Sequence, residues 1–237
     1  LFFFLCLNLF GQQESIESLK NELKLVKHDT ARVRIYLDMA NSCDIDEFYR
    51  YSNLVVELSE KNLKTTSNEK IKSVFLKFMG RGFANIGLVY ADKGDYKTSR
   101  EYADKGLKIQ EQVGDTLAIA TSFCNIGVLY ASQGDIKRAT DYYEKSLVLR
   151  ERIQHKRGIF ECLNNIGVIY DNQGDISRAI DYYMKSLKIA EEINDKIAMA
   201  ASYNNLGYIY GNQDDSENSL KYHLKSYVYI LVLKAFL

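Results

Sequence analysis

Four asparagines return along the chain at a constant interval of 40 residues: Asn85, Asn125, Asn165 and Asn205. A carboxamide offers a hydrogen-bond donor and an acceptor side by side, which are the two groups that a peptide main chain also presents. Asparagine is only a mediocre helix former, so its return at a single phase needs a reason other than helix propensity. The constant spacing therefore indicates that the asparagine has the same role in each repeated unit.

The asparagines belong to a repeated tripeptide, which is Asn-Ile-Gly in the first three copies and Asn-Leu-Gly at 205–207. A period of this size is typical of stacked supersecondary units. Around the first copy, Phe83, Ile86, Gly87 and Tyr90 follow the helical spacing i, i+3, i+4, i+7, and the later copies keep it. At about 100° per residue the asparagine lies roughly 150° from this stripe, outside the core of a helix pair. A helical glycine costs roughly 1 kcal/mol against alanine, so we expect a neighbouring helix to approach closely there.

A second helix is expected after each first one. The turns between them are Gly94-Asp95, Gly134-Asp135 and Gly174-Asp175, with Asp214-Asp215 as the weakest in the last unit. The second helices carry small residues at Ser99, Ala139, Ala179 and Ser219, followed by Tyr102, Tyr142, Tyr182 and Tyr222. Small residues opposite aromatic ones allow antiparallel helices to nest, and no proline interrupts the chain. The pattern predicts an all-α fold, a right-handed α-solenoid (superhelix) of antiparallel helix pairs.

This succession of an aromatic residue, Ile-Gly or Leu-Gly, tyrosine, small residue and aromatic residue across two helices resembles the tetratricopeptide repeat. The commonest form of that repeat has about 34 residues and a closing proline, whereas these units have 40 residues and the chain has no proline. They are similar to the longer-helix repeats of kinesin light chains and of bacterial peptide-responsive regulators. The resemblance covers about residues 76–226. It implies a non-catalytic scaffold that binds a protein or an extended peptide.

The period sets the expected domain organisation. Four repeats are expected at 76–115, 116–155, 156–195 and 196–237, the last with an atypical apolar end. Residues 12–75 are expected to form a degenerate helical region of the same kind, because the terminal units of a stack are atypical. The apolar end favours a chain that continues into a further repeat, with a helix that docks on its own array as the alternative.

Residues 1–11 form an apolar leader, after which the sequence becomes polar. Its stretch of ten largely apolar residues is too short for a membrane span, which takes about 20. They suit the apolar core of a truncated signal peptide. We therefore expect an exported protein, in the bacterial periplasm, with membrane attachment only through sequence outside this chain. The alternatives are a hydrophobic first helix docked on the repeats and a cytoplasmic protein.

The charge balance argues against nucleic acid as a partner. The 31 basic and 31 acidic residues leave a net charge of zero, so the chain lacks the positive footprint that phosphate backbones require. Four lysines recur in phase on the second helices and are expected to form a solvated stripe: Lys105, Lys145, Lys185 and Lys225.

Reactive residues do not form a recognisable site. His28, His155 and His223 are isolated, so we expect no metal, no cofactor, no catalytic residue and no enzyme activity. The four cysteines show no paired spacing. Cys124 and Cys162, on first helices, are expected to be small core residues.

The resemblance also implies a binding surface. In tetratricopeptide repeats the matching asparagine of the first helix grips the backbone of an extended peptide in the concave groove. The expected peptide-binding residues are the repeat asparagines and their neighbours on that face: Asn85, Asn125, Asn165, Asn205, Asn164, Asn204, Val128, Val168 and Tyr208. The alternative is that the asparagines hydrogen-bond between adjacent repeats and fix the stacking.

A second interpretation of the function belongs to signalling. Repeat arrays behind a leader resemble the ligand-sensing extracytoplasmic regions of bacterial sensor kinases and transcription regulators. The output domain of such a protein would lie outside this chain. This interpretation is an analogy of fold.

Overall fold

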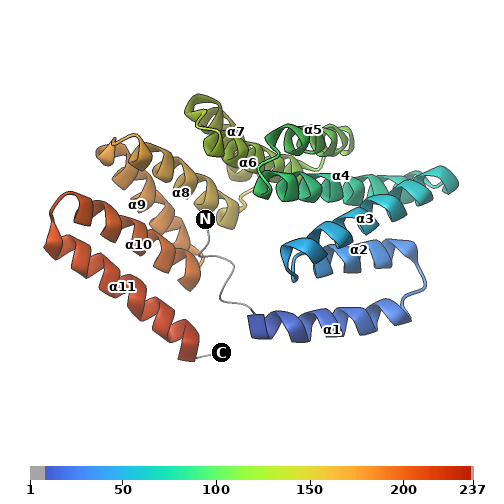
Figure 1. Ribbon diagram of the computed structural model, residues 1–237, viewed down its shortest axis with the longest axis horizontal. Coiled ribbons are helices and arrows are strands. Elements are labelled where there is room, and N and C mark those ends of the chain that lie inside the picture. Colours follow the sequence, from blue (N-terminus) through green and yellow to red (C-terminus); the bar gives the residue numbers. More distant parts are fainter. Residues whose placement is uncertain (1–8, 236–237) are drawn as a thin grey trace. The chain divides into compact units, whose positions relative to one another are not determined.

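The structure, a computed structural model, describes the backbone of residues 9–235 and the side chains of residues 16–231. Its regular elements in that range are all helices, with no strand, so the predicted all-α fold of paired helices is confirmed (Figure 1). The helices are α1 (Leu9–Leu25), α2 (Asp29–Ala40), α3 (Ile45–Thr65), α4 (Glu69–Asp92), α5 (Tyr96–Val113), α6 (Thr116–Ser132), α7 (Ile136–Arg152), α8 (Lys156–Asn172), α9 (Ile176–Glu192), α10 (Lys196–Asn212) and α11 (Ser216–Ala235). Most of the leader predicted at 1–11 lies outside the described residues, as do the last two residues of the apolar end.

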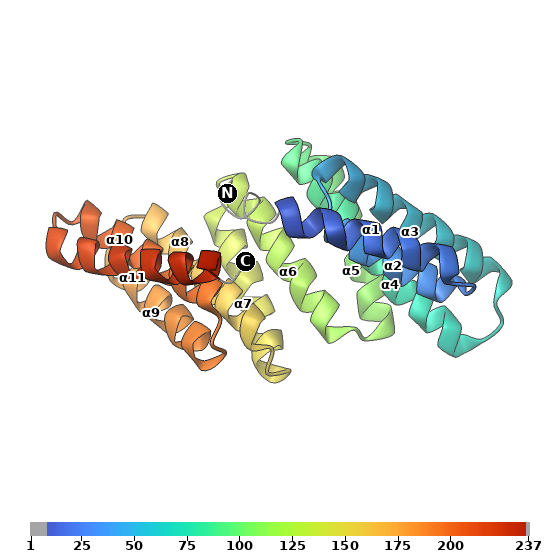
Figure 2. The same ribbon diagram turned by 90° about the horizontal axis from the view of Figure 1, so that it is seen from below.

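The chain divides into two compact units, Leu1–Ser122 and Phe123–Leu237, whose boundary lies inside α6. In the first unit α3 packs on α2 and α4, and α4 packs on α5. In the second unit α8 packs on α7 and α9, and α10 packs on α9 and α11. Figure 2 shows α8 to α11 side by side. None of the described helices is long and apolar enough to cross a lipid bilayer.

The glycines of the first helices lie where a neighbouring helix approaches closely, as predicted. A Cβ on Gly87 would lie 3.1 Å from the carbonyl oxygen of Ser99 on α5. A Cβ on Gly167 would lie 2.7 Å from the ring of Tyr183 on α9. A side chain at Gly167 would therefore force the Tyr183 ring to move, and one at Gly87 would push α4 and α5 slightly apart.

Stacked tyrosines join the two helices of every repeat. The ring centroids are 5.6 Å apart for Tyr90–Tyr102 and Tyr130–Tyr142, and 5.4 Å apart for Tyr170–Tyr182 and Tyr210–Tyr222. Such pairs contribute roughly 0.5–1.5 kcal/mol beyond the area that they bury. Most of the conspicuous tyrosine content of the repeats is thus structural.

The turns inside the repeats use the left-handed backbone conformation. Gly94, Gly134 and Gly174 have φ of 75–76°, and Asp214, which stands in the same place, has φ of 60°. The turns that lead into α8 and α10 also contain a positive φ, at Gln154 (54°) and Asn194 (51°). Side chains with a Cβ are disfavoured in this conformation.

An aspartate caps each second helix. Asp95, Asp135, Asp175 and Asp215 each accept a hydrogen bond from the backbone N–H three residues later, at 3.0–3.1 Å. The caps satisfy N–H groups that a helix start otherwise leaves without partners. The Gly-Asp dipeptide therefore ends one helix and begins the next.

Buried polar contacts differ from one junction of adjacent repeats to the next. Between α5 and α6, Ser122 Oγ donates to Gln110 Oε1 at 2.7 Å. Between α7 and α8, Arg150 Nη1 donates to Glu161 Oε2 at 2.7 Å. Between α9 and α10, the hydroxyls of Ser186 and Ser202 lie 3.1 Å apart. In the 40-residue register these residues stand at corresponding positions or close to them, so each junction has its own chemistry.

The first repeat has a longer first helix than the later ones. α4 begins at Glu69, upstream of residue 76 where the period placed the repeat, because the Asn68 side chain accepts hydrogen bonds from Lys70 N and Ile71 N. The extra turns bury Phe75 against α2 and α3. The repeat boundaries themselves stay predictions.

Candidate functional site

The repeat asparagines lie on the first helices, in α4, α6, α8 and α10. All four side chains are half-buried, at the border between the packed stripe of the helix and solvent: Asn85, Asn125, Asn165 and Asn205. They are therefore not members of the buried core.

Two of these amides bridge to the preceding first helix. Asn205 Nδ2 donates to Asn164 Oδ1 at 2.9 Å, which joins α10 to α8. Asn165 Nδ2 donates to Cys124 Sγ at 3.7 Å, a long contact that joins α8 to α6. At these two positions the asparagine fixes the stacking of repeats, as the alternative prediction stated. Part of its hydrogen-bonding capacity is therefore used inside the protein.

The side chains beside these bridges face solvent on α8 and α10. Asn204 is exposed, Val168 is 37% exposed and Tyr208 is 58% exposed, while Asn164 is half-buried. Because α8 and α10 contact each other, the four side chains form one continuous surface, here called the α8–α10 face. This surface alternates amides with apolar groups.

The remaining predicted residue has a different environment. Val128 of α6 is half-buried and packs against the cluster that contains Ala139, Tyr143 and Ile166. It therefore contributes mainly to the core of the second unit.

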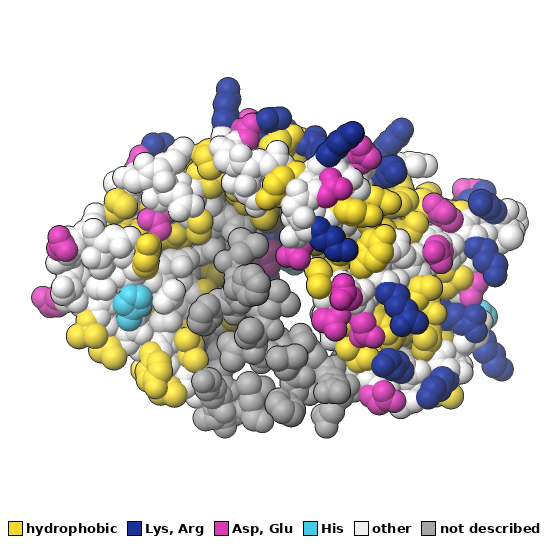
Figure 3. Space-filling view, viewed as in Figure 1, with side chains coloured by type: hydrophobic (Ala, Val, Ile, Leu, Met, Phe, Trp, Pro, Cys, Tyr) yellow, Lys and Arg dark blue, Asp and Glu magenta, His cyan; other side chains and the backbone are white. Residues whose placement is uncertain are grey.

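One side of α10 and α11 carries little charge. Figure 3 shows mostly hydrophobic and uncharged side chains on the visible side over α10 and α11, with few of Lys, Arg, Asp and Glu. Complementary charge steers and selects partners. A partner for this part of the molecule would have to be chosen by shape and hydrogen bonding instead.

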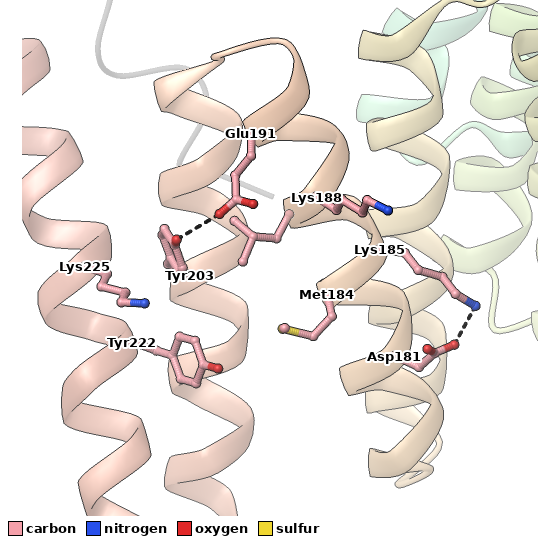
Figure 4. A pocket seen from close by; sticks show the side chains of 9 residues that line it. Asp181, Met184, Lys185, Lys188, Glu191, Tyr203, Tyr222 and Lys225 are labelled. Carbon is pink, nitrogen blue, oxygen red and sulfur yellow. Dashed lines mark hydrogen bonds and ion pairs between the residues drawn. The ribbon is translucent and has the colours of Figure 1, made fainter.

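A hollow of about 470 Å³ lies among α9, α10 and α11 (Figure 4). Three of its charged side chains already have partners: Lys185 Nζ donates to Asp181 Oδ2 at 2.6 Å, and Glu191 Oε1 accepts from Tyr203 Oη at 3.3 Å. The Lys185–Asp181 ion pair offsets part of the charge that the hollow could offer to a ligand, and Lys188 and Lys225 also line it.

The in-phase lysines have a structural role that the sequence analysis missed. Each ammonium group lies over the ring of the tyrosine three residues earlier, 4.8–5.7 Å from its centroid. The pairs are Lys105–Tyr102, Lys145–Tyr142, Lys185–Tyr182 and Lys225–Tyr222. A cation over an aromatic face gains roughly 0.5–1 kcal/mol at exposed sites. The recurring Tyr-x-x-Lys spacing could have predicted these contacts, because residues three apart on a helix are neighbours.

The histidines of the repeats have packing and capping positions. His155 Nδ1 accepts a hydrogen bond from Gly158 N at 3.1 Å and so caps α8, where the neighbouring repeats have aspartate. His223 lies against Gly207, because a Cβ there would come within 2.8 Å of its Nδ1. Among the described side chains, no three of His, Cys, Asp or Glu gather as a metal site requires.

Comparison with known proteins places the repeat pattern in a family and the structure among solved folds. The family model of the tetratricopeptide repeat matches residues 81–152 and 158–227, more than half of the chain. BtubC (BKLC) from P. vanneervenii has a TM-score of 0.70 at 17% identity, with 94% of this chain and 90% of that chain covered. Kinesin light chain-like repeats from Podosopora anserina have a TM-score of 0.56 at 13% identity, with 86% and 97% covered.

A Rap protein complexed with Competence and Sporulation Factor has a TM-score of 0.63 at 13% identity, with 95% of this chain and 73% of that chain covered. At these identities the structural similarities show the fold alone. Comparison with curated proteins gives no match. The family match covers both helices of successive repeats, including their stacked tyrosines and Gly-Asp turns, so the chain belongs to the tetratricopeptide-repeat family.

Proposed function

We propose that the α8–α10 face binds an extended peptide, or an extended segment of a partner protein, and that the chain is a non-catalytic scaffold. The observation that carries this proposal is the pair Asn204 and Tyr208. Both side chains are exposed, and the Asn204 amide makes no hydrogen bond to another described residue. A free amide beside an exposed aromatic ring supplies the two kinds of contact that an extended peptide requires, to its backbone and to its side chains.

Further support comes from the neighbouring helix and from the fold. One repeat earlier, α8 also presents an amide, Asn164, and an exposed apolar side chain, Val168. An extended ligand that crosses α8 and α10 would therefore contact an amide and an apolar group on each helix. The similar Rap structure was solved with Competence and Sporulation Factor bound. Tetratricopeptide folds in general serve protein–protein contacts rather than catalysis.

The experiment is a selection followed by a binding measurement. The immobilised full chain is used to select from a displayed library of random peptides, and enriched peptides are labelled for fluorescence anisotropy. The double variant Asn204→Ala with Tyr208→Ala is expected to weaken these peptides by about tenfold or more, because a hydrogen bond contributes ~0.5–1.5 kcal/mol and an exposed aromatic anchor adds to it.

A matched control uses the hollow among α9, α10 and α11. The double variant Lys185→Ala with Lys225→Ala removes two of its side chains and is expected to leave peptide affinity unchanged. If the lysine variant loses the selected peptides and the Asn204/Tyr208 variant retains them, the binding surface is the hollow and the proposal is wrong.

A further inference from the structure

Two cysteines that are distant in the sequence meet in the second unit. Cys124 on α6 is 7% exposed and Cys162 on α8 is 0% exposed, and both are free thiols. Asn165 Nδ2, one helical turn after Cys162 on α8, donates to Cys124 Sγ at 3.7 Å, so the Cys124 thiol lies against the part of α8 that carries Cys162. Cys162 Sγ also donates to Ser146 Oγ at 3.2 Å. Their separation of 38 residues matches no known cysteine spacing, so the sequence analysis treated each as a single core residue.

A buried arginine lies beside this pair. Arg150 is 3% exposed and pairs with Glu161, while its Nε has no hydrogen-bond partner among the described residues. Gly158 makes room for it, because a Cβ there would overlap the guanidinium group. The corresponding residues in the neighbouring repeats are Gln110 and Ala190, so this positive charge is particular to one junction.

The surroundings favour a thiolate at Cys162. The neighbouring Cys124 thiol lowers the pKa of Cys162, with smaller contributions from Ser146 and the Arg150 charge that act against desolvation and Glu161. The same contact raises the pKa of Cys124. Since the thiolate is the reactive form of cysteine, the proposed nucleophile is Cys162, which also contacts Ser146 Oγ, and the proposed resolving thiol is Cys124.

We propose that Cys124 and Cys162 form a peroxide-sensitive dithiol that closes into a reversible disulfide between α6 and α8. In the first step the Cys162 thiolate attacks one oxygen of a hydroperoxide, the O–O bond breaks, and Cys162 becomes a sulfenic acid as hydroxide or alkoxide leaves. In the second step the Cys124 sulfur attacks the Cys162 sulfur, the S–O bond breaks, and water leaves with the Cys124 proton. Each sulfur has then lost one electron to the peroxide.

Burial selects a small oxidant. Cys162 has no exposed surface and the pair reaches solvent only at Cys124, so a hydroperoxide is favoured over a bulky disulfide. A dithiol reductant reverses the reaction by thiol–disulfide exchange.

The test treats the full chain with hydrogen peroxide at neutral pH, then unfolds it and alkylates the remaining thiols before digestion and mass spectrometry. The expected result is one linked peptide pair containing Cys124 and Cys162, lighter by two hydrogens and lost after dithiothreitol treatment. Cys43 is an internal comparison, since burial and the nearby carboxylates of Glu47 and Asp44 raise its pKa to about 11. It is expected to react more slowly than the pair.

The repeats supply matched variants. Cys162→Ser introduces the residue that neighbouring repeats have as Ser122 and Ser202, and Cys124→Ala introduces the residue of Ala84. Neither variant is expected to give the linked peptide, and both are expected to fold. Two results would overturn the proposal: Cys43 oxidised while Cys124 and Cys162 remain alkylatable, or linkage that forms in denaturant but not in the native chain.

The variant Arg150→Gln tests the effect of the Arg150 charge on the thiols. Glutamine is chosen because Gln110 occupies the corresponding position one repeat earlier. The charged and titratable groups that face the thiols are Arg150 and Tyr143 from α7 and Glu161 from α8. Without the guanidinium the rate of disulfide formation is expected to fall several-fold at neutral pH and its midpoint to move to higher pH. An unchanged pH profile would contradict the role of Arg150.

Discussion

Asn204 and Asn205 are adjacent amides on α10 with different surroundings. Asn205 donates to Asn164, whereas Asn204 is exposed and makes no hydrogen bond to another described residue. Asn205→Ala is expected to destabilise the fold by about 0.5–1.5 kcal/mol, the net worth of one hydrogen bond. This corresponds to a lower melting temperature by roughly 1–6 °C for a chain of this size.

Asn204→Ala is expected to leave the melting temperature unchanged and to weaken a selected peptide. Thermal unfolding followed by circular dichroism, together with anisotropy on the same samples, separates the two effects. The assignment of roles is wrong if Asn204→Ala melts earlier while Asn205→Ala does not.

At the scale of residues, the sequence predicts which side chains lie outside the core, but not which residues they contact. Helical periodicity correctly placed Asn85, Asn125, Asn165 and Asn205 outside the core. It could not show that Asn205 and Asn165 bond to the preceding repeat, because that contact depends on how close two first helices lie. The meeting of Cys124 with Cys162 was hidden for the same reason.

At the scale of elements, the start of each second helix depends on an ionised aspartate. The hydrogen bonds from Arg138, from its side chain and its backbone, lower the pKa of Asp135 below its ordinary value of 3.8, and Asp175 has the corresponding arrangement with Arg178. A carboxyl whose pKa is depressed by folding stabilises the fold above its unfolded pKa. That contribution disappears as the pH falls through the folded pKa.

Replacing both aspartates by asparagine keeps an oxygen cap but removes the titrating group. The double variant Asp135→Asn with Asp175→Asn is expected to melt slightly earlier at neutral pH and to lose less stability than the parent below pH 3.8. Melting temperatures measured from neutral to acidic pH check this. Parallel curves for parent and variant would show that these caps do not contribute to acid sensitivity.

The last turn is the one place where a repeat departs from glycine. Asp214 has φ of 60°, where Gly94, Gly134 and Gly174 stand in the other repeats. Asp214→Gly is expected to stabilise the chain by about 0.5–1 kcal/mol, because the left-handed conformation disfavours a Cβ. The reverse change, Gly174→Asp, is expected to destabilise it by a similar amount.

Denaturant unfolding of the two turn variants measures both effects on one scale. Equal unfolding midpoints for the parent, Asp214→Gly and Gly174→Asp would contradict the prediction that a side chain in this left-handed conformation costs stability. The weakness of this turn was readable from the sequence, since Gly-Asp and Asp-Asp differ in a known backbone preference. The positive φ of Gln154 was not predictable from the sequence, because glutamine is not a residue that favours this conformation, whereas asparagine, present at Asn194, does adopt it.

At the scale of the whole molecule, the regular period allows one complete repeat to be deleted as a test. Deleting residues 156–195 would place Arg150 against Ala198 and Ala201, which stand in the 40-residue register where Gly158 and Glu161 were. The deletion is therefore expected to fold but to be destabilised by about 3–5 kcal/mol, the cost of a buried charge without its partner.

The substitution Arg150→Ala should rescue the shortened chain, because it recreates the natural junction of Ala190 and Ser186 with Ser202. In the full chain the same substitution is expected to destabilise, because it removes the Arg150–Glu161 ion pair and leaves a cavity beside Gly158. Chemical denaturation of the four proteins forms a cycle. An effect of the same sign in both chain lengths would contradict this account of the junction.

Nearly identical repeats within one chain carry a hazard during folding, since a first helix could dock on the wrong second helix. The unequal junctions give each copy a means of rejecting such neighbours. Arg150 fits only where Gly158 leaves space and Glu161 supplies a carboxylate, and Gln110 is satisfied by Ser122 and by the carbonyl oxygen of Gly80. A misdocked pair would bury an unmatched polar group, which is costly. The polar contacts at the junctions thus favour the native pairing of the repeats, in addition to the order that the covalent chain imposes.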